Sequence, residues 1–291
     1  GTQLITATLD PEGRTGIETV VAGSRDESIF QPLWIGNDRL LYVSDATGFW
    51  NLYCYSDSEI HCVLPDDAEY GLPQWGLGIT NFVSLSEHHV IAQRIHEGVS
   101  ELVTVNIDQC TRSPLMADYS SYQSLTRTTR GIAFIGGNHN DVAEVVELDV
   151  TSGNINMISK QGVVNFPQGT FSPPSTIRYK TNDGAIGYGN FYPPVHPDWQ
   201  GDDGELPPLL VMSHGGPTGA ASRDLSMRTQ YYTSRGWAVL DVNYGGSTGF
   251  GRAYRERLNG NWGTVDVNDC VAGVSHLATH HLIDINRVAI R

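Results

Sequence analysis

The sequence predicts a chain of two parts. Residues 1–165 are expected to form part of a β-propeller, and residues 166–291 the first part of an α/β domain. Two observations carry this division. Short segments of alternating apolar and polar residues recur about every 40–50 residues in the first part, with turn sequences between them. In the second part, apolar strands alternate with helical patterns, which is typical of a mainly parallel sheet covered on both faces.

The propeller prediction depends on a repeat. Pro32-Leu33-Trp34 recurs as Pro73-Gln74-Trp75, and a third unit fits residues 122–159. Four strands per unit at this spacing are typical of propeller blades, whereas a β-sandwich would not require the Pro-x-Trp recurrence. Because three blades cannot close a ring, we expect only the C-terminal blades of one. The expected strands are 4–9, 18–21, 39–44, 50–55, 60–64, 82–85, 132–135, 145–150 and 155–158.

The second part begins after a stretch rich in Gly, Pro, Ser and Asn at residues 161–175, which indicates a crossing between domains. Asn182-Asp183-Gly184 is a hairpin signal between two predicted strands. The expected elements are strands 176–181, 186–192 and 209–212, helix 225–235, strand 237–243, helices 254–258 and 265–281, and a strand that begins at Arg287.

Composition argues against several classes of function. A net charge of −14 disfavours nucleic-acid binding, because phosphate needs a basic face. No apolar run approaches the roughly 18 residues of a membrane span. Of the four cysteines, Cys54 and Cys62 could pair across a hairpin, but free thiols are favoured, and with them a cytoplasmic compartment. No cofactor is predicted, and the oligomeric state stays open.

A glycine-rich turn follows a buried strand. The apolar run Leu209–Met212 stops at Ser213-His214-Gly215-Gly216-Pro217. The glycines let the backbone turn tightly and leave its N–H groups bare. α/β-Hydrolases build half of an oxyanion hole in this way, with amides aimed at the charge that develops during acyl transfer. An ordinary Gly-Pro turn explains these residues equally well by themselves.

Ser247 lies in a literal G-x-S-x-G, the pattern of a nucleophile elbow. The order of residues argues against that role, since the histidines after Ser247 all fall on one helix, at 276–281. An elbow also enters its helix directly, whereas Gly249-Phe250-Gly251 continues the loop. A structural or substrate-facing loop is favoured, and a lipase-like or esterase-like hydrolase that uses Ser247 is the first alternative.

Metal and nucleotide sites are not predicted. His276 and His280 have the spacing of a metal-binding helix, but the metallopeptidase pattern needs Glu where this chain has Leu277. No Walker-type loop exists, since neither Lys160 nor Lys180 follows a glycine.

Several motifs, taken in order, resemble the prolyl oligopeptidase family of serine peptidases, and most closely its acylaminoacyl-peptidase and dipeptidyl-peptidase-like branch. They are residues 27–34, 42–53, 214–217, 231–239, 243–251, 262–269 and 286–290. One departure is Gly245, where the family commonly has Arg, and this bears on how the loop is anchored.

The resemblance implies a β-propeller that caps an α/β-hydrolase domain, with a peptide substrate reaching the site between them. This chain would hold the last blades and the first half of the hydrolase domain. The strand from Arg287 would lead into the true elbow, so the catalytic Ser, Asp and His would all lie beyond Arg291.

What the resemblance places in this chain is the oxyanion side. The N–H of Gly216 would bind the oxyanion and Gly215 would permit the turn. His214 stands where other branches carry an assisting Tyr. Three further residues, Asn243, Tyr244 and Ser247, would lie on a loop near the substrate cleft.

The implied function is a serine-type exo- or oligopeptidase that cuts short peptides through an acyl-enzyme. The chain by itself is expected to be inactive, because it would lack the nucleophile. A non-catalytic propeller module that binds peptides or partner proteins is the second alternative. An exposed hydrophobic sheet edge is expected to make the isolated chain poorly soluble.

Overall fold

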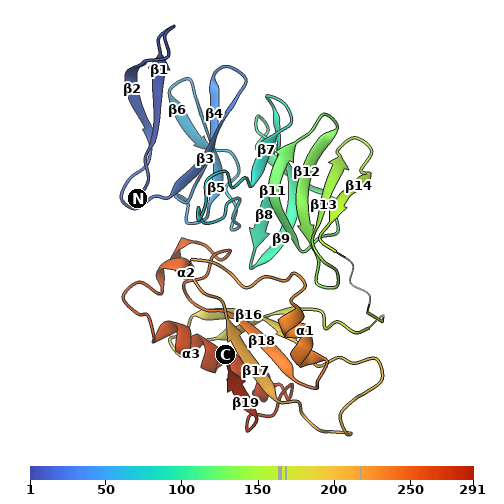
Figure 1. Cartoon of the computed structure of the whole chain (residues 1–291). Helices are drawn as coiled ribbons and strands as arrows, with labels where there is room; N and C mark the ends of the chain where they lie inside the picture. The colour runs from blue at the N-terminus through green and yellow to red at the C-terminus, as the bar shows by residue number, and fades with distance from the viewer. Residues whose placement is uncertain (163–165, 168, 217) are drawn as a thin grey trace.

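The computed structural model describes residues 1–162, 166–167, 169–216 and 218–291. Figure 1 shows a strand-rich part above a smaller α/β part, and the chain passes from one to the other after β14. The domain crossing predicted at residues 161–175 lies partly outside the described residues.

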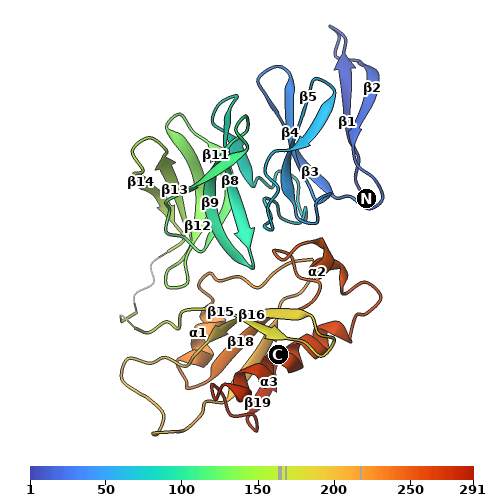
Figure 2. The ribbon, with the colours of Figure 1, turned by 180° about the vertical axis from the view of Figure 1, so that it is seen from behind.

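Three four-stranded antiparallel sheets stand side by side in the first part (Figures 1 and 2), preceded by the hairpin β1–β2. Each sheet takes its strands in chain order, as propeller blades do. The part is therefore propeller-like and partial. The strands are β1 Leu4–Leu9, β2 Thr15–Ala22, β3 Ile29–Ile35, β4 Arg39–Ser44, β5 Asn51–Ser56, β6 Glu59–Cys62, β7 Phe82–Ser84, β8 His89–His96, β9 Val99–Asn106, β10 Thr111–Leu115, β11 Ser121–Arg127, β12 Gly131–Gly137, β13 Glu144–Asp149 and β14 Ile155–Lys160.

The Pro-x-Trp recurrence does not mark equivalent positions. Trp34 lies in β3, the first strand of its sheet, whereas Trp75 lies in the loop between β6 and β7. Both indole rings are more than half exposed. The sequence therefore predicted the number of four-stranded sheets. It did not predict where each sheet begins in the chain, because a long loop after Cys62 shifts the second sheet toward the C-terminus.

The middle sheet is buried on both faces. Val90 and Ala92 of β8 pack toward the first sheet, while Ile91 between them packs toward the third. A strand covered on both sides needs a continuous apolar run rather than alternation. Strand β8 was for that reason not among the strands predicted from the period-2 pattern.

The four cysteines are free thiols, as favoured from the sequence. Cys54 lies opposite His61 in the ladder, while Cys62 lies opposite Tyr53. The register therefore places the two thiols on opposite faces of the first sheet, and they belong to different apolar clusters. A Cys54–Cys62 disulfide does not form.

The α/β part contains a five-stranded mixed sheet in the order β15-β16-β18-β17-β19. Strands β17, β18 and β19 are parallel, and β15 and β16 form an antiparallel hairpin at one edge. At the other edge, β19 exposes Val288 and Ile290. The elements are β15 Ser175–Lys180, β16 Ile186–Tyr192, β17 Leu209–Ser213, α1 Met227–Thr233, β18 Ala238–Asn243, α2 Arg252–Glu256, α3 Val265–Thr279 and β19 Val288–Ile290.

Successive side chains along each strand point to opposite faces of this sheet. Val211 and Leu240 pack against α3, whereas Leu210 and Val239 pack with residues of the α1 side. Because β17 and β18 are parallel, the loops that follow them both start at the carboxyl ends of these strands, on the same side of the sheet. Among the described residues, no helix is both long and apolar enough for a bilayer crossing.

Candidate active site

The glycine turn lies directly after the buried strand β17. Leu209–Met212 are buried, whereas Gly215 and Gly216 are exposed. Gly216 has a φ of 138°, a conformation that side-chain-bearing residues rarely adopt. Within the described part of the chain, the N–H groups of Gly215 and Gly216 donate to no protein acceptor. Exposed, unpaired N–H groups at the end of a sheet strand are chemically suited to hold a negative oxygen.

His214 is held in place by the loop that follows β18. Its ring stacks on Tyr244 with 4.6 Å between ring centroids, and the Tyr244 hydroxyl donates to the His214 carbonyl oxygen at 3.0 Å. Its Nε2 lies 2.7 Å from Ser247 Oγ, and its Nδ1 lies 3.0 Å from the Gly215 carbonyl oxygen. Burial lowers the pKa of His214, so the ring is neutral at neutral pH.

Ser247 is fully buried, with 0% of its surface exposed. Its Oγ lies 2.8 Å from the Tyr244 carbonyl oxygen as well as close to His214. The distance to His214 is that of a nucleophile and its base, but a hydroxyl without exposed surface has no access to a substrate. This geometry favours the structural interpretation of Ser247.

Asn243 and Tyr244 are buried too, and they support the segment that contains the glycine turn. Asn243 Oδ1 accepts a hydrogen bond from the Ala221 N–H at 2.8 Å, and the Thr248 N–H donates to the Gly219 carbonyl at 2.8 Å. The sequence named this loop but did not reveal that its side chains support the turn. That the loop of Asn243, Tyr244 and Ser247 lies near the substrate cleft stays a prediction.

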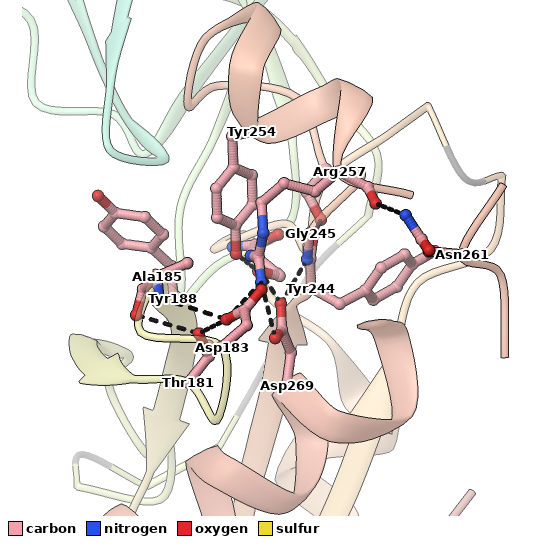
Figure 3. A network of polar contacts seen from close by, with 12 residues as sticks. Thr181, Asp183, Ala185, Tyr188, Tyr244, Gly245, Tyr254, Arg257, Asn261 and Asp269 are labelled. Atoms are coloured by element: carbon pink, nitrogen blue, oxygen red, sulfur yellow. Dashed lines mark hydrogen bonds and ion pairs between the residues drawn. The ribbon is translucent and has the colours of Figure 1, made fainter. Parts of the chain in front are cut away.

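An arginine from another element fills the space beside Gly245 (Figure 3). A Cβ atom at position 245 would lie 2.7 Å from Nη1 and 2.8 Å from Cζ of Arg257. The Gly245 N–H donates to Asp269 Oδ2 at 2.7 Å, and Arg257 Nη1 lies 3.0 Å from the same oxygen. Arg257 Nη2 reaches Asp183 at 3.1 Å. The loop after β18 is thus tied to α3 and to the β15–β16 turn.

The two carboxylates around Arg257 have opposite environments. Burial raises the pKa of Asp269, while the Gly245 N–H and Arg257 act against that rise. The Thr181 hydroxyl, with Arg257 contributing, lowers the pKa of the exposed Asp183 to about 2. Sequence reasoning did not find this network, because Asp183, Arg257 and Asp269 lie on a hairpin, a helix end and a second helix.

A cavity of about 720 Å³ lies between the two parts of the chain. Its lining includes Trp50, Trp75, Thr218, Gly246 and Arg255. Trp75 donates through Nε1 to the Thr218 carbonyl oxygen at 2.7 Å, so the propeller-like part contacts the segment just after the glycine turn. The cavity therefore reaches the residue just after the glycine turn, although neither Gly215 nor Gly216 lines it.

The described residues contain no group of three or more His, Cys, Asp or Glu side chains that could hold a metal ion. The rings of His276 and His280 lie 4.3 Å apart near the end of α3, and His280 Nδ1 contacts the His276 carbonyl oxygen at 2.8 Å. These contacts belong to the C-terminal end of α3.

Fold and site together define a class of protein: a mixed α/β sheet with an exposed glycine turn at the carboxyl end of β17, covered by propeller-like sheets. Residues 223–291 match the family model described as prolyl oligopeptidase family. The resemblance to the prolyl oligopeptidase family is confirmed, and residues 223–291 are the segment that matches its model.

Named relatives agree with this assignment. A puromycin-hydrolyzing peptidase of Mycobacterium tuberculosis superposes with a TM-score of 0.93 at 33% identity, covering 99% of this chain and 44% of that one. The acylamino-acid-releasing enzyme of Arabidopsis thaliana is 33% identical over 31% of this chain and 12% of its own length. Dipeptidyl aminopeptidase BIII of Pseudoxanthomonas mexicana is 35% identical over 28% of this chain and 12% of its own length. The chain therefore spans less than half the length of each of these proteins.

Proposed function

We propose that this chain is part of a serine-type peptidase that hydrolyses short peptides through an acyl-enzyme. On this proposal, residues 1–165 are the last blades of a β-propeller, and residues 166–291 are the first half of an α/β-hydrolase domain. The observation that carries the proposal is the exposed Gly215–Gly216 turn, whose N–H groups have no protein acceptor among the described residues. A cavity between the two parts reaches Thr218, just after that turn. The peptidases among the similar proteins support it.

The chemistry assigned to this chain is stabilisation of charge. When a nucleophile attacks a peptide carbonyl, the oxygen becomes negative, and the Gly216 N–H donates to it. Gly215 permits the turn, and His214, neutral and stacked on Tyr244, fixes the direction of the turn. One such donor is worth roughly 10²–10³ in rate. The Ser, Asp and His of the triad lie beyond Arg291 on this proposal, so the chain by itself is inactive.

A serine-reactive fluorophosphonate probe tests the assignment. In the full-length polypeptide that contains this chain, we expect one labelled serine outside residues 1–291, together with hydrolysis of aminoacyl amides. A chain of residues 1–291 should remain unlabelled. As a control, Ser247→Ala in the full-length protein should leave labelling intact, because Ser247 is buried.

The opposite result has a clear meaning. If residues 1–291 are labelled and Ser247→Ala removes the label, Ser247 is the nucleophile and the esterase-like alternative holds. If the full-length polypeptide neither reacts with the probe nor cleaves amides, the peptidase proposal is wrong.

A further inference from the structure

Glu69 projects from the propeller-like part into the loop that supports the glycine turn. It lies between β6 and β7, where its backbone N–H and C=O each pair with Ile95 at 2.8 Å. Its side chain is fully buried, with 0% exposed. Its Oε2 accepts the Gly249 N–H at 2.6 Å, and its Oε1 accepts the Gly251 N–H at 3.1 Å. Both oxygens of one carboxylate thus bind backbone of the α/β part.

Only glycine fits at positions 249 and 251, where the loop backbone approaches the propeller-like part. A Cβ atom at position 251 would lie 2.9 Å from the ring of Phe49, and one at position 249 would lie 3.3 Å from Ile95 Cγ2. Both glycines have a positive φ, 85° and 92°. The backbone of the loop is therefore pressed against the base of the propeller-like part, with the Glu69 carboxylate as its acceptor.

Positive charge also faces this carboxylate. Arg255 Nη1 lies 3.7 Å from Glu69 Oε1, and Arg255 Nη2 lies 2.6 Å from the buried Asp45. Arg252 reaches Asp45 as well, at 3.3 Å. Burial raises the pKa of Glu69 to about 7, while Arg255 and the two N–H groups act in the other direction. Helix α2, which carries both arginines, lies between the two parts (Figures 1 and 2).

A short series of contacts leads from Glu69 to the glycine turn. Glu69 binds Gly249, the next residue Thr248 donates to the Gly219 carbonyl oxygen at 2.8 Å, and Ser247 Oγ contacts His214 Nε2 at 2.7 Å. Ser247 and Thr248 therefore bind residues on either side of the glycine turn. Both come directly before Gly249, where Glu69 holds the loop.

We propose that Glu69 is a positioning residue for the glycine turn, so that the propeller-like part sets the geometry of the site that it covers. It acts through the N–H groups of Gly249 and Gly251 rather than by touching substrate. This inference rests on the proposed function for its catalytic consequence. Its structural consequence, a loop at residues 243–251 ordered by Glu69, is independent of that function.

Glu69→Gln in the full-length protein tests the proposal, because glutamine keeps the shape but removes the charge and turns one acceptor into a donor that faces an N–H group. We expect kcat for a peptide amide to fall about tenfold or more, with KM changed much less, since the donors of the turn act in the transition state. Amide hydrogen exchange should become faster at residues 247–251 and 214–216. Glu69→Asp, which keeps the charge on a shorter side chain, should change both quantities less.

Asp66→Asn is the matched control. Asp66 lies on the same loop and is nearly buried, with 11% exposed, but its Arg94 and Tyr70 partners lie in the propeller-like part. It should lower stability without speeding exchange at residues 247–251. If Glu69→Gln leaves exchange there unchanged, or Asp66→Asn changes kcat and exchange as much, the proposal is wrong.

The two proposals fail in distinguishable ways. If the full-length protein has no peptidase activity but Glu69→Gln still speeds exchange in the loop and the turn, the function is wrong and the positioning role stands. If Glu69→Gln does not fold, the exchange pattern and kcat of Glu69→Asp against Asp66→Asn decide the question in the same way.

Discussion

Replacing Asp269 with alanine is expected to lower the free energy of unfolding by about 3–5 kcal/mol, the usual cost of removing one partner from a buried ion pair. The Asp269 side chain is 1% exposed and that of Arg257 is 16% exposed, so the guanidinium would lose its buried counter-charge. The Gly245 N–H would lose its acceptor as well. Chemical denaturation of the full-length protein, followed by a signal from the α/β part, measures the change.

Asp183→Ala is the control for this prediction. Asp183 is the other carboxylate on Arg257, but its side chain is 57% exposed. Exposed ion pairs contribute at most about 1 kcal/mol, so the control should stay within that range. A loss for Asp269→Ala no larger than that for Asp183→Ala would show that the buried pair does not hold the loop.

Gly245→Ala is expected to destabilise the protein by about 1–3 kcal/mol, the range found when a methyl group is forced into a filled space. The backbone of Gly245 is not left-handed, so the obstacle lies in its neighbours: Arg257 and the Val265 methyl at 2.8 Å. In an Arg257→Ala background the two guanidinium atoms are absent and only the contact with the Val265 methyl remains. We therefore expect the alanine at position 245 to cost less there, with a coupling of about 1 kcal/mol or more in a double-mutant cycle.

The cycle is measured by denaturation of the four variants. Gly236→Ala offers a comparison, since no atom lies within 4 Å of a Cβ there but φ is 81°, so its cost is conformational and should be the same with or without Arg257. If the Gly245 and Arg257 effects simply add, the guanidinium does not fill the space of a side chain at position 245.

These variants concern Gly245, one departure from the pattern of the family that the sequence resembles. The family commonly has Arg where this chain has Gly245. Here the guanidinium of Arg257, at the end of α2, lies beside position 245 and meets Asp269. The structure therefore explains how the loop is anchored without a side chain at position 245.

Some of the architecture could be predicted from the sequence because it follows from local patterns. Period-2 alternation predicted most strands of the propeller-like part. Alternating strands and helices predicted a mainly parallel sheet, whereas in the structure β17, β18 and β19 are parallel and β15 and β16 are antiparallel. The apolar run before Gly215 predicted β17 and the turn after it. The Pro-x-Trp repeat aligned the first two sheets wrongly. Trp34 and Trp75 have similar sequence surroundings, but Trp34 lies in a strand and Trp75 lies in a loop.

Tertiary structure decided the support of the turn. Three contacts between different elements of the chain provide this support. Ser247 is buried against His214, Arg257 occupies the space beside Gly245, and Glu69 binds Gly249. Residue type and spacing specify the conformation of a short segment, but not which distant segment packs on it. The sequence by itself therefore determined a bare glycine turn after a buried strand, whereas only the packing of the two parts decided which side chains hold that turn in place.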